Sequence, residues 1–145
     1  MLHTLLSEQR IRKITWITDW KEGIAIAAQP LVKDGSITEQ YISEMIAAVE
    51  RFGPYIVLTD KFALPHAQGT DYVKRTAMSL LIAENETDMK GQPVSMFMIL
   101  ASTDGKSHMG ALINLATILG EKENLSIFEK GDTKKILSLI QELKR

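Results

Sequence analysis

The sequence predicts an α/β fold in which a mixed β-sheet of about five strands carries helices on both faces. Short apolar runs rich in β-branched residues alternate with longer segments whose apolar residues recur at helical spacing. One run, residues 94–102, is apolar on both faces, which is typical of a strand in a covered sheet. Because no linker, repeat or low-complexity tract divides the 145 residues, we expect a single domain spanning residues 1–145.

Apolar periodicity and capping residues predict where the helices lie. The first begins near Asp19 and ends at residues 33–35, where lysine, aspartate and glycine favour a helix end. Near the C-terminus, Gly131 and Asp132 separate two helices as a C′ glycine followed by an N-cap. Two further helices are predicted from apolar stripes, one with Ile42, Met45, Ile46 and Val49 and the last of the chain with Ile136, Leu139, Ile140 and Leu143.

A wider apolar stripe predicts a central helix over residues 109–119. The stripe consists of Met109, Leu112, Ile113, Ala116 and Leu119, with Leu115 and Ile118 adding to it. Because these positions cover more than one face of a helix, we expect this helix to pack on two neighbours. Strands are predicted at residues 55–59, 76–83 and 94–102, and a short strand at residues 13–17 is expected at the sheet edge.

Composition excludes several classes of function. Lysine and arginine total 17 against 18 acidic residues, and this balance gives no basic excess for binding nucleic acid. The longest apolar run is far shorter than the roughly 20 residues of a membrane-spanning helix, and the first ten residues do not resemble a signal peptide. We therefore expect a cytoplasmic protein that does not insert into a membrane. With no cysteine, its chemistry must use histidine, carboxylates, hydroxyls and backbone groups.

The stretch FALPHAQGT, residues 62–70, presents His66 directly after a proline. Proline fixes its own φ and favours an extended conformation for Leu64, so the histidine sits on a stiffened segment. The small polar residues that follow leave room for an anion and supply N–H donors. A neutral imidazole has an unprotonated nitrogen that can attack phosphorus. His66 could therefore carry a phosphoryl group, although a partly buried loop histidine with a satisfied hydrogen bond is the alternative.

A second histidine, His108, comes after the long predicted strand and a polar turn, at the start of the wide-stripe helix. The N-terminus of a helix that follows a strand is a common ligand site in α/β proteins, and its N–H groups favour anions. A polar residue facing water at a helix start is the alternative.

These motifs resemble a known family. The order GPYIVLTDKFALPHA, a long apolar strand and then DGKSHMGALINLATIL is similar to the IIA domains of the bacterial phosphoenolpyruvate-dependent sugar phosphotransferase system, in the mannitol–fructose superfamily. The segments RFGPYIV and ALPHA look most like the ascorbate-specific branch, and GSITEQYISEMI extends the resemblance upstream. Residues 68–70 read Gln-Gly-Thr where the ascorbate branch usually has Arg-Pro-Glu.

The resemblance implies a phosphocarrier. His66 would take a phosphoryl group on Nε2 from the carrier protein HPr and pass it to a cysteine of a IIB protein, which serves a membrane IIC component. His108 would support the phosphoryl group by hydrogen bonding, and Arg51 falls near the position of an active-site arginine in the mannitol branch. No cofactor and no metal is expected, because donor and acceptor are protein side chains. The chain has no cysteine, so the IIB acceptor is expected to be a separate protein.

Two other functions stay open on sequence grounds. A regulatory module of the same fold would use the same histidine chemistry without feeding sugar transport. A metal-dependent hydrolase could use His66, His108, Asp71 and Asp104, but these histidines lack a short ligand spacing.

Two groups of apolar residues also have alternative interpretations. Phe62, Ala63, Leu64 and Ala67 could form a shallow docking surface around His66, or most of them could belong to the core. Trp16 and Trp20 are expected to be core or packing aromatics rather than a platform for sugar stacking.

Overall fold

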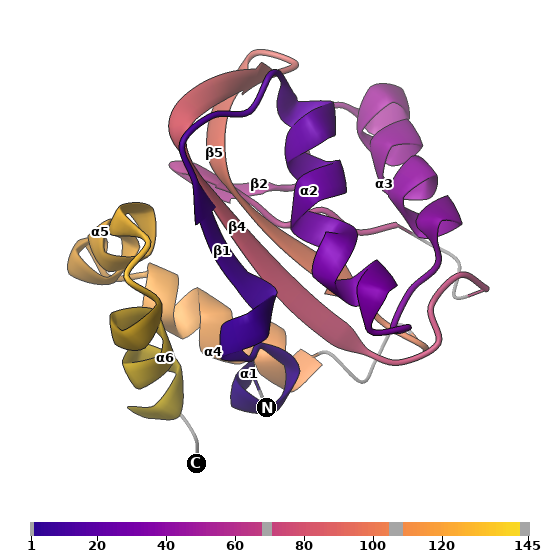
Figure 1. Ribbon diagram of the computed structural model, residues 1–145. Helices are drawn as coiled ribbons and strands as arrows, with labels where there is room; N and C mark the ends of the chain where they lie inside the picture. The colour runs from indigo at the N-terminus through magenta and orange to yellow at the C-terminus, as the bar shows by residue number, and fades with distance from the viewer. Residues whose placement is uncertain (1, 68–70, 105–108, 143–145) are drawn as a thin grey trace.

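The computed structural model describes residues 2–67, 71–104 and 109–142, and Figure 1 shows how they are arranged. In chain order the elements are α1 (Leu2–Leu5), the 3₁₀ helix η1 (Glu8–Arg10), β1 (Ile11–Ile14), α2 (Trp20–Lys33), α3 (Glu39–Phe52), β2 (Val57–Thr59), β3 (Lys61–Ala63), β4 (Ala77–Met89), β5 (Gln92–Ala101), α4 (Met109–Leu119), α5 (Lys122–Lys130) and α6 (Thr133–Glu142).

Within these described residues, five strands form one mixed sheet in the order β1-β4-β5-β3-β2. β1 lies parallel to β4 at one edge, and β3 lies parallel to β5, whereas the β4–β5 and β2–β3 pairs are antiparallel. The long β4–β5 hairpin turns at Lys90 and Gly91, whose φ angles of 53° and 98° are typical of a tight two-residue turn. The sheet confirms the expected mixed architecture and the edge position of the first strand, although this strand spans Ile11–Ile14 rather than residues 13–17.

Helices cover both faces of this sheet, as Figure 1 shows, with α2 and α3 on one side and α1, α4, α5 and α6 on the other. Alternate residues of the two central strands supply the two cores, because successive side chains of a strand point to opposite faces. Leu81 and Phe97 pack with α2 and α3, whereas Leu80 and Met98 pack with the C-terminal helices. The predicted α/β sandwich is confirmed.

Close packing of α2 on the sheet depends on Gly23. A Cβ atom at this position would stand 2.5 Å from Cζ of Phe97, closer than real atoms approach. The absence of a side chain therefore lets α2 lie directly against Phe97 of β5.

Local signals placed the helix ends correctly. Oδ1 of Asp19 accepts a hydrogen bond from the Glu22 N–H at 2.9 Å, so Asp19 is the N-cap of α2. Gly131, with φ of 71°, ends α5, and Oδ1 of Asp132 accepts a hydrogen bond from the Lys135 N–H at 3.2 Å at the start of α6. The stripe of α3 is buried at Ile42, Met45 and Val49.

The prediction for α4 was partly wrong about which residues are buried. Leu115 and Ile118, which widened the predicted stripe, are buried together with Ala111, whereas Met109 is 52% and Ile113 is 63% exposed. The helix packs against α1, α5 and α6, and these neighbours decide which part of its wide apolar surface is covered. Leu143, expected in the stripe of the last helix, lies outside the described residues.

Of the two tryptophans predicted to be core or packing residues, one is buried and the other is exposed. Trp20 is buried in the core, as expected, but Trp16 is 67% exposed and is not a core residue. Residues 55–56 form a turn rather than the start of a strand, and β2 begins at Val57.

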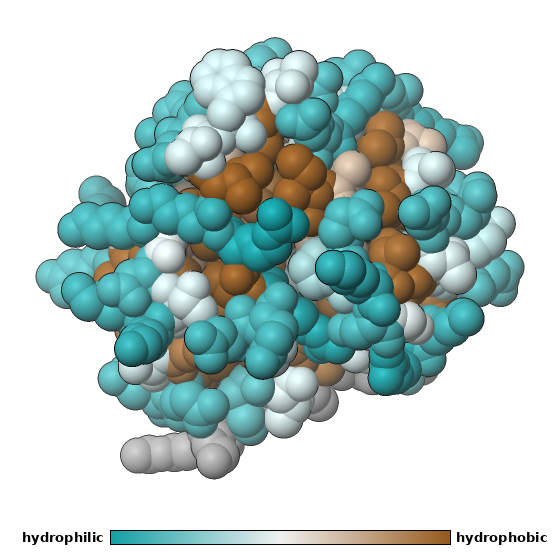
Figure 2. Space-filling view, in the orientation of Figure 1, coloured by the Kyte–Doolittle hydropathy of each residue, from teal (hydrophilic) through white to brown (hydrophobic). Residues whose placement is uncertain are grey.

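Figure 2 shows that most side chains on the viewed face are hydrophilic, with apolar ones between them. No helix in the described part of the chain is long and apolar enough to cross a bilayer.

Candidate active site

His66 follows β3 on a segment that the sheet fixes on both sides. The Leu64 N–H donates to the carbonyl oxygen of Ile56 at 2.8 Å, and the carbonyl oxygen of Pro65 accepts from the Leu100 N–H at 2.9 Å. Because Pro65 has no N–H and a restricted φ, the segment has few alternative conformations. The backbone that carries His66 is therefore held against the end of β5.

A carbonyl oxygen determines which nitrogen of His66 is protonated. Nδ1 lies 2.7 Å from the carbonyl oxygen of Leu64. A carbonyl only accepts hydrogen bonds, so the neutral ring carries its proton on Nδ1 and donates it to Leu64. Nε2 is then left with a lone pair. The half-buried imidazole thus has one anchored nitrogen and one nitrogen available for chemistry.

Tyr41 of α3 joins three parts of the site. Its hydroxyl donates to the carbonyl oxygen of Leu100 at 2.9 Å and accepts from the Ala67 N–H at 3.2 Å. The side chain is 2% exposed, and burial raises the pKa of Tyr41. This one hydroxyl fixes the residue after His66 to both helix α3 and strand β5.

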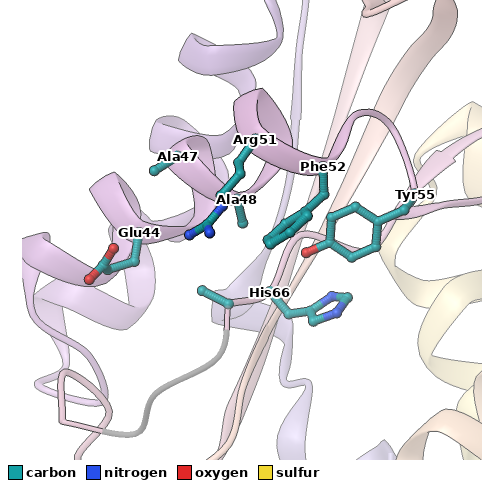
Figure 3. Close-up of a pocket in the computed structure, with 8 residues that line it drawn as sticks. Glu44, Ala47, Ala48, Arg51, Phe52, Tyr55 and His66 are labelled. Carbon is teal, nitrogen blue, oxygen red and sulfur yellow. The ribbon is translucent and has the colours of Figure 1, made fainter.

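A cleft of about 530 Å³ opens beside His66, as Figure 3 shows. One wall is a face of α3, where residues spaced by three and four positions lie side by side. Two alanines in this wall leave space, and the guanidinium of Arg51 reaches into it. The cleft is lined by Glu44, Ala47, Ala48, Arg51, Phe52, Tyr55, His66 and Ala67.

Aromatic rings form the other side of the cleft. The rings of Tyr55 and His66 meet edge to face, with centroids 5.6 Å apart and planes at 81°. Phe52 meets Tyr55 in the same way at 6.1 Å and 88°, and Cζ of Arg51 lies 5.2 Å from the centre of the Phe52 ring. Partial burial raises the pKa of Tyr55.

The described residues around His66 can hold and exchange an anionic group. Nε2 supplies a nucleophile, and Arg51 supplies a permanent positive charge that forms no ion pair elsewhere in the described part of the chain. No group of three or more histidine, aspartate and glutamate side chains in the described residues is arranged to hold a metal ion.

Comparison with known proteins identifies the family. The family model for the phosphoenolpyruvate-dependent sugar phosphotransferase system, EIIA 2, matches residues 4–143. The chain belongs to this family. It is a IIA chain of the EIIA 2 type and so a component of that phosphotransferase system. The resemblance seen in the sequence motifs is thereby confirmed.

Two relatives and one solved structure illustrate the similarity of this IIA chain. The mannitol-specific cryptic phosphotransferase enzyme IIA component of Escherichia coli (strain K12) is 30% identical over 133 residues, which cover 90% of each chain. The ascorbate-specific PTS system EIIA component of the same strain is 25% identical over 125 residues, covering 83% of this chain and 81% of the relative. The solution structure of the mannitol-specific cryptic enzyme IIA from Escherichia coli matches with a TM-score of 0.86 at 28% identity, over 98% and 99% of the two chains.

A solved complex of IIAMTL with phosphorylated IIBMTL from Escherichia coli matches more distantly. The TM-score is 0.77 at 17% identity, and the match covers 95% of the chain described here and 99% of the chain from the complex. At this level of identity the match shows a shared fold.

The structure brings together two of the three site residues predicted for the IIA chain. His66 and Arg51 line the same cleft, although they come from different elements. His108 lies outside the described residues, so its predicted role is untested by the geometry.

Three site residues were missed at the sequence level. Tyr41, Phe52 and Tyr55 approach His66 only through the fold, although the position of Tyr41, four residues before Met45 in the stripe, indicated a buried residue.

The proposed docking surface requires a correction. Phe62, Ala63 and Leu64 are buried and belong to the core, as the alternative interpretation held, and only Ala67 lies partly at the surface. Two exposed aromatic residues line the cleft instead, Phe52 and Tyr55, with exposed fractions of 65% and 48%, and Leu58 on β2 is 50% exposed.

Proposed function

We propose that this IIA chain is a phosphocarrier that accepts a phosphoryl group from phospho-HPr on Nε2 of His66. It then transfers the group to a cysteine of a separate IIB protein. The observation that carries this proposal is the hydrogen bond from Nδ1 of His66 to the Leu64 carbonyl oxygen at 2.7 Å. That bond leaves Nε2 as the nucleophilic nitrogen, beside a cleft that also contains Arg51.

The proposed first step is a displacement at phosphorus. The lone pair of Nε2 forms a bond to phosphorus, and the bond from phosphorus to the HPr side chain breaks with its electron pair staying on the donor. The imidazole now has a proton on Nδ1 and phosphorus on Nε2, so the ring is positively charged. The Leu64 carbonyl, which accepts the Nδ1 proton, stabilises that charge.

The second step returns the electron pair to Nε2. A thiolate of IIB attacks phosphorus, the N–P bond breaks, and the His66 ring is restored to its neutral tautomer. A thiolate is the reactive form of cysteine, and the 145 residues contain none, so the acceptor thiolate is proposed to come from a separate IIB protein. A serine ester would hold the group too firmly for such a relay.

Cationic groups in the cleft are proposed to stabilise the phosphorylated form of His66, which is half-buried. Phosphorylation adds about 1.5 to 2 negative charges at neutral pH. Arg51 and His108 are proposed to offset this charge by hydrogen bonding, and catalysis would consist mainly of positioning and electrostatic stabilisation. Because both reaction partners are protein side chains, the scheme needs no cofactor and no metal.

The relatives support a role in sugar transport. The similar curated proteins are named for mannitol and for ascorbate. A nitrogen regulatory protein IIA from Neisseria meningitidis shares the fold at 19% identity, a level that supports no shared role. We therefore propose transport of ascorbate or a related sugar, through IIB and indirectly IIC, with phosphoryl exchange in the cytoplasm. A regulatory role not coupled to transport is the alternative.

Labelling with phosphoenolpyruvate, enzyme I and HPr tests the phosphocarrier proposal. Wild type should take up label that is lost in acid and kept in base, because an N–P bond is cleaved at low pH. His66→Ala should take up none, whereas the control His3→Gln should be labelled as wild type is. Acid-stable label, or normal labelling of His66→Ala, would contradict the assignment of His66.

The same labelled protein separates the alternatives for its role. Mixed with purified IIB proteins specific for ascorbate and for mannitol, it should pass label to a cysteine of one of them. Transfer to the ascorbate-specific IIB supports the proposed sugar class. Label that reaches no IIB protein, while a regulatory target binds only one phosphorylation state, would support the regulatory alternative.

A further inference from the structure

Tyr55 stands across the cleft from Arg51, with its hydroxyl directed into the space beside His66 (Figure 3). Its ring meets the His66 imidazole edge to face at 5.6 Å. The ring that carries the reactive nitrogen is therefore in direct contact with the ring that carries this hydroxyl. A group bonded to the His66 ring would therefore lie next to a residue that lines the same cleft.

Two rings contact the Tyr55 ring. The His66 ring packs against it at 81°, and the Phe52 ring packs against it at 88° with a centroid distance of 6.1 Å. Such perpendicular aromatic contacts restrict the orientation of a ring. The backbone is held as well, because Gly53 ends α3 with a φ of 83° and the Val57 N–H donates to the Pro54 carbonyl oxygen at 3.1 Å.

The Tyr55 hydroxyl has no protein partner within the part of the chain that the structure describes. It forms no hydrogen bond with any of those residues, and Tyr55 is 48% exposed. A phenol with an ordinary pKa near 10 is protonated at neutral pH and can donate one hydrogen bond. Among the described residues, the hydroxyl is thus a donor without an acceptor.

We propose that the Tyr55 hydroxyl donates a hydrogen bond to a phosphoryl oxygen when the group is bonded to Nε2 of His66. This inference rests on the phosphocarrier function proposed above and adds a catalytic residue to it. Tyr55 and Arg51 then hold the phosphoryl group from opposite sides of the cleft. Glu44, which lines the same cleft, is an acceptor when ionised and cannot contribute.

The physical basis is the strength of hydrogen bonds to anions. A bond from a neutral donor to a charged acceptor is about twice as strong as one between neutral groups. The two ring contacts of Tyr55 reduce the orientational entropy that is lost when the bond forms. Burial, which raises the pKa of Tyr55, also keeps the phenol protonated in its role as a donor.

Phosphorylation by a small donor tests the proposal directly. Phosphoramidate transfers a phosphoryl group to histidine without any partner protein, so the labelling rate of His66 can be compared between variants. Tyr55→Phe removes the hydroxyl but keeps both aromatic contacts, and its rate should fall about 10- to 100-fold. Tyr72→Phe is the matched control, because Tyr72 is half-buried and does not line the cleft, and its rate should match wild type.

Two further measurements separate a direct contact from a structural effect. The ³¹P chemical shift of phosphorylated His66 should differ between wild type and Tyr55→Phe, and the thermal midpoints of the unphosphorylated proteins should agree. The equilibrium of phosphoryl exchange with HPr should also shift about 10- to 100-fold toward phospho-HPr in Tyr55→Phe. A labelling rate within twofold of wild type, or an unchanged ³¹P shift, would overturn the proposal.

The outcomes for Tyr55 and for the proposed function can be told apart. If phosphoramidate labels His66 but phospho-HPr does not, the phosphocarrier role fails. The comparison of Tyr55→Phe with wild type then still shows whether Tyr55 contacts the phosphoryl group. If phospho-HPr labels wild type and Tyr55→Phe equally well, the phosphocarrier role stands and the Tyr55 proposal fails.

Discussion

At the level of single residues, the reactivity proposed for His66 depends on a carbonyl oxygen two positions earlier in the chain. The contact between Nδ1 and the Leu64 oxygen selects one tautomer and keeps the ring from turning. The local reason is Pro65, which holds the intervening backbone in a restricted conformation. Arg51 contributes differently, since its guanidinium rests over the Phe52 ring and is available to an anion in the cleft.

His108 can be tested at the same scale. If it only stabilises the phosphoryl group, His108→Ala should still be phosphorylated by phospho-HPr, but about 10- to 100-fold more slowly, because one charge-assisted hydrogen bond of roughly 1.5 to 3 kcal/mol is lost. The rate should be measured with purified phospho-HPr, with and without EDTA, after enzyme I and its Mg²⁺ have been removed.

Each outcome of this experiment has a defined meaning. Chelator should have no effect on the rate if the phosphocarrier proposal is correct. Bound metal in the purified protein and loss of activity with EDTA would instead support the metal-dependent hydrolase. Unchanged transfer by His108→Ala would show that this histidine takes no part in the reaction.

At the level of secondary-structure elements, α3 has two separate roles in the site. Its exposed face forms the wall of the cleft, and its buried face carries Tyr41, whose hydroxyl joins the helix to Ala67 and Leu100. Position in the helix explains the division, because residues 41 and 45 point to the core while residues 44, 47, 48 and 51 lie on another side. The helix therefore couples the packing of the core to the position of the segment after His66.

Removing the Tyr41 hydroxyl should weaken both folding and catalysis. Tyr41→Phe leaves the Ala67 N–H and the Leu100 carbonyl without their partner, which should lower the free energy of unfolding by about 1 to 3 kcal/mol. Urea unfolding at neutral pH measures the change, with Tyr72→Phe as the control. Phosphorylation of His66 should slow in the same variant because Ala67 is no longer held. Equal stability of the two variants would contradict this role.

The pH dependence of stability provides a second test of Tyr41. Burial raises the pKa of Tyr41 in the folded state, so the unfolded chain loses the phenol proton first, above about pH 10. The stability that the protonated phenol contributes is therefore fully present below that pH and is lost as the pH rises toward the folded pKa. Tyr41→Phe should show a smaller loss of unfolding free energy in this alkaline range than wild type does.

At the level of the whole molecule, helices pack on both faces of the sheet and the cleft beside His66 opens at the surface. The cleft opens between α3 and the segments that follow it, and exposed apolar side chains of Phe52, Tyr55 and Leu58 lie near His66 or on the adjacent strand β2. The net charge is -1, so attraction of a partner over long distances is weak. Recognition must therefore depend on local contacts.

Docking with each partner should accordingly be short-lived. We expect an interface below about 1,200 Å² in total with HPr and with IIB, because the same surface must release one before binding the other. Sedimentation or calorimetry with unphosphorylated HPr should show weak binding, with a high dissociation constant that changes little with salt concentration. A tight, slowly dissociating complex would contradict this expectation.

The sequence determined the features that depend on short segments of chain. Asp19 and Gly131 predicted helix ends through capping chemistry, and Pro65 predicted an extended, stiff presentation of His66. These signals succeed because the interactions that cause them lie within a few residues of each other. The family resemblance added the phosphotransferase family and the pairing of Arg51 with His66, which residue spacing alone would not have predicted.

Only the tertiary structure decided which distant side chains meet. The buried face of α4, the exposure of Trp16 and the burial of Phe62 depend on which elements pack nearby. Nothing in the local sequence of Tyr41 or Tyr55 shows that one hydroxyl holds Ala67 and that the other ring contacts His66. Such contacts form only when the helices pack on the two faces of the sheet. Each side chain then meets a surface that comes from another part of the chain, which its own segment does not contain.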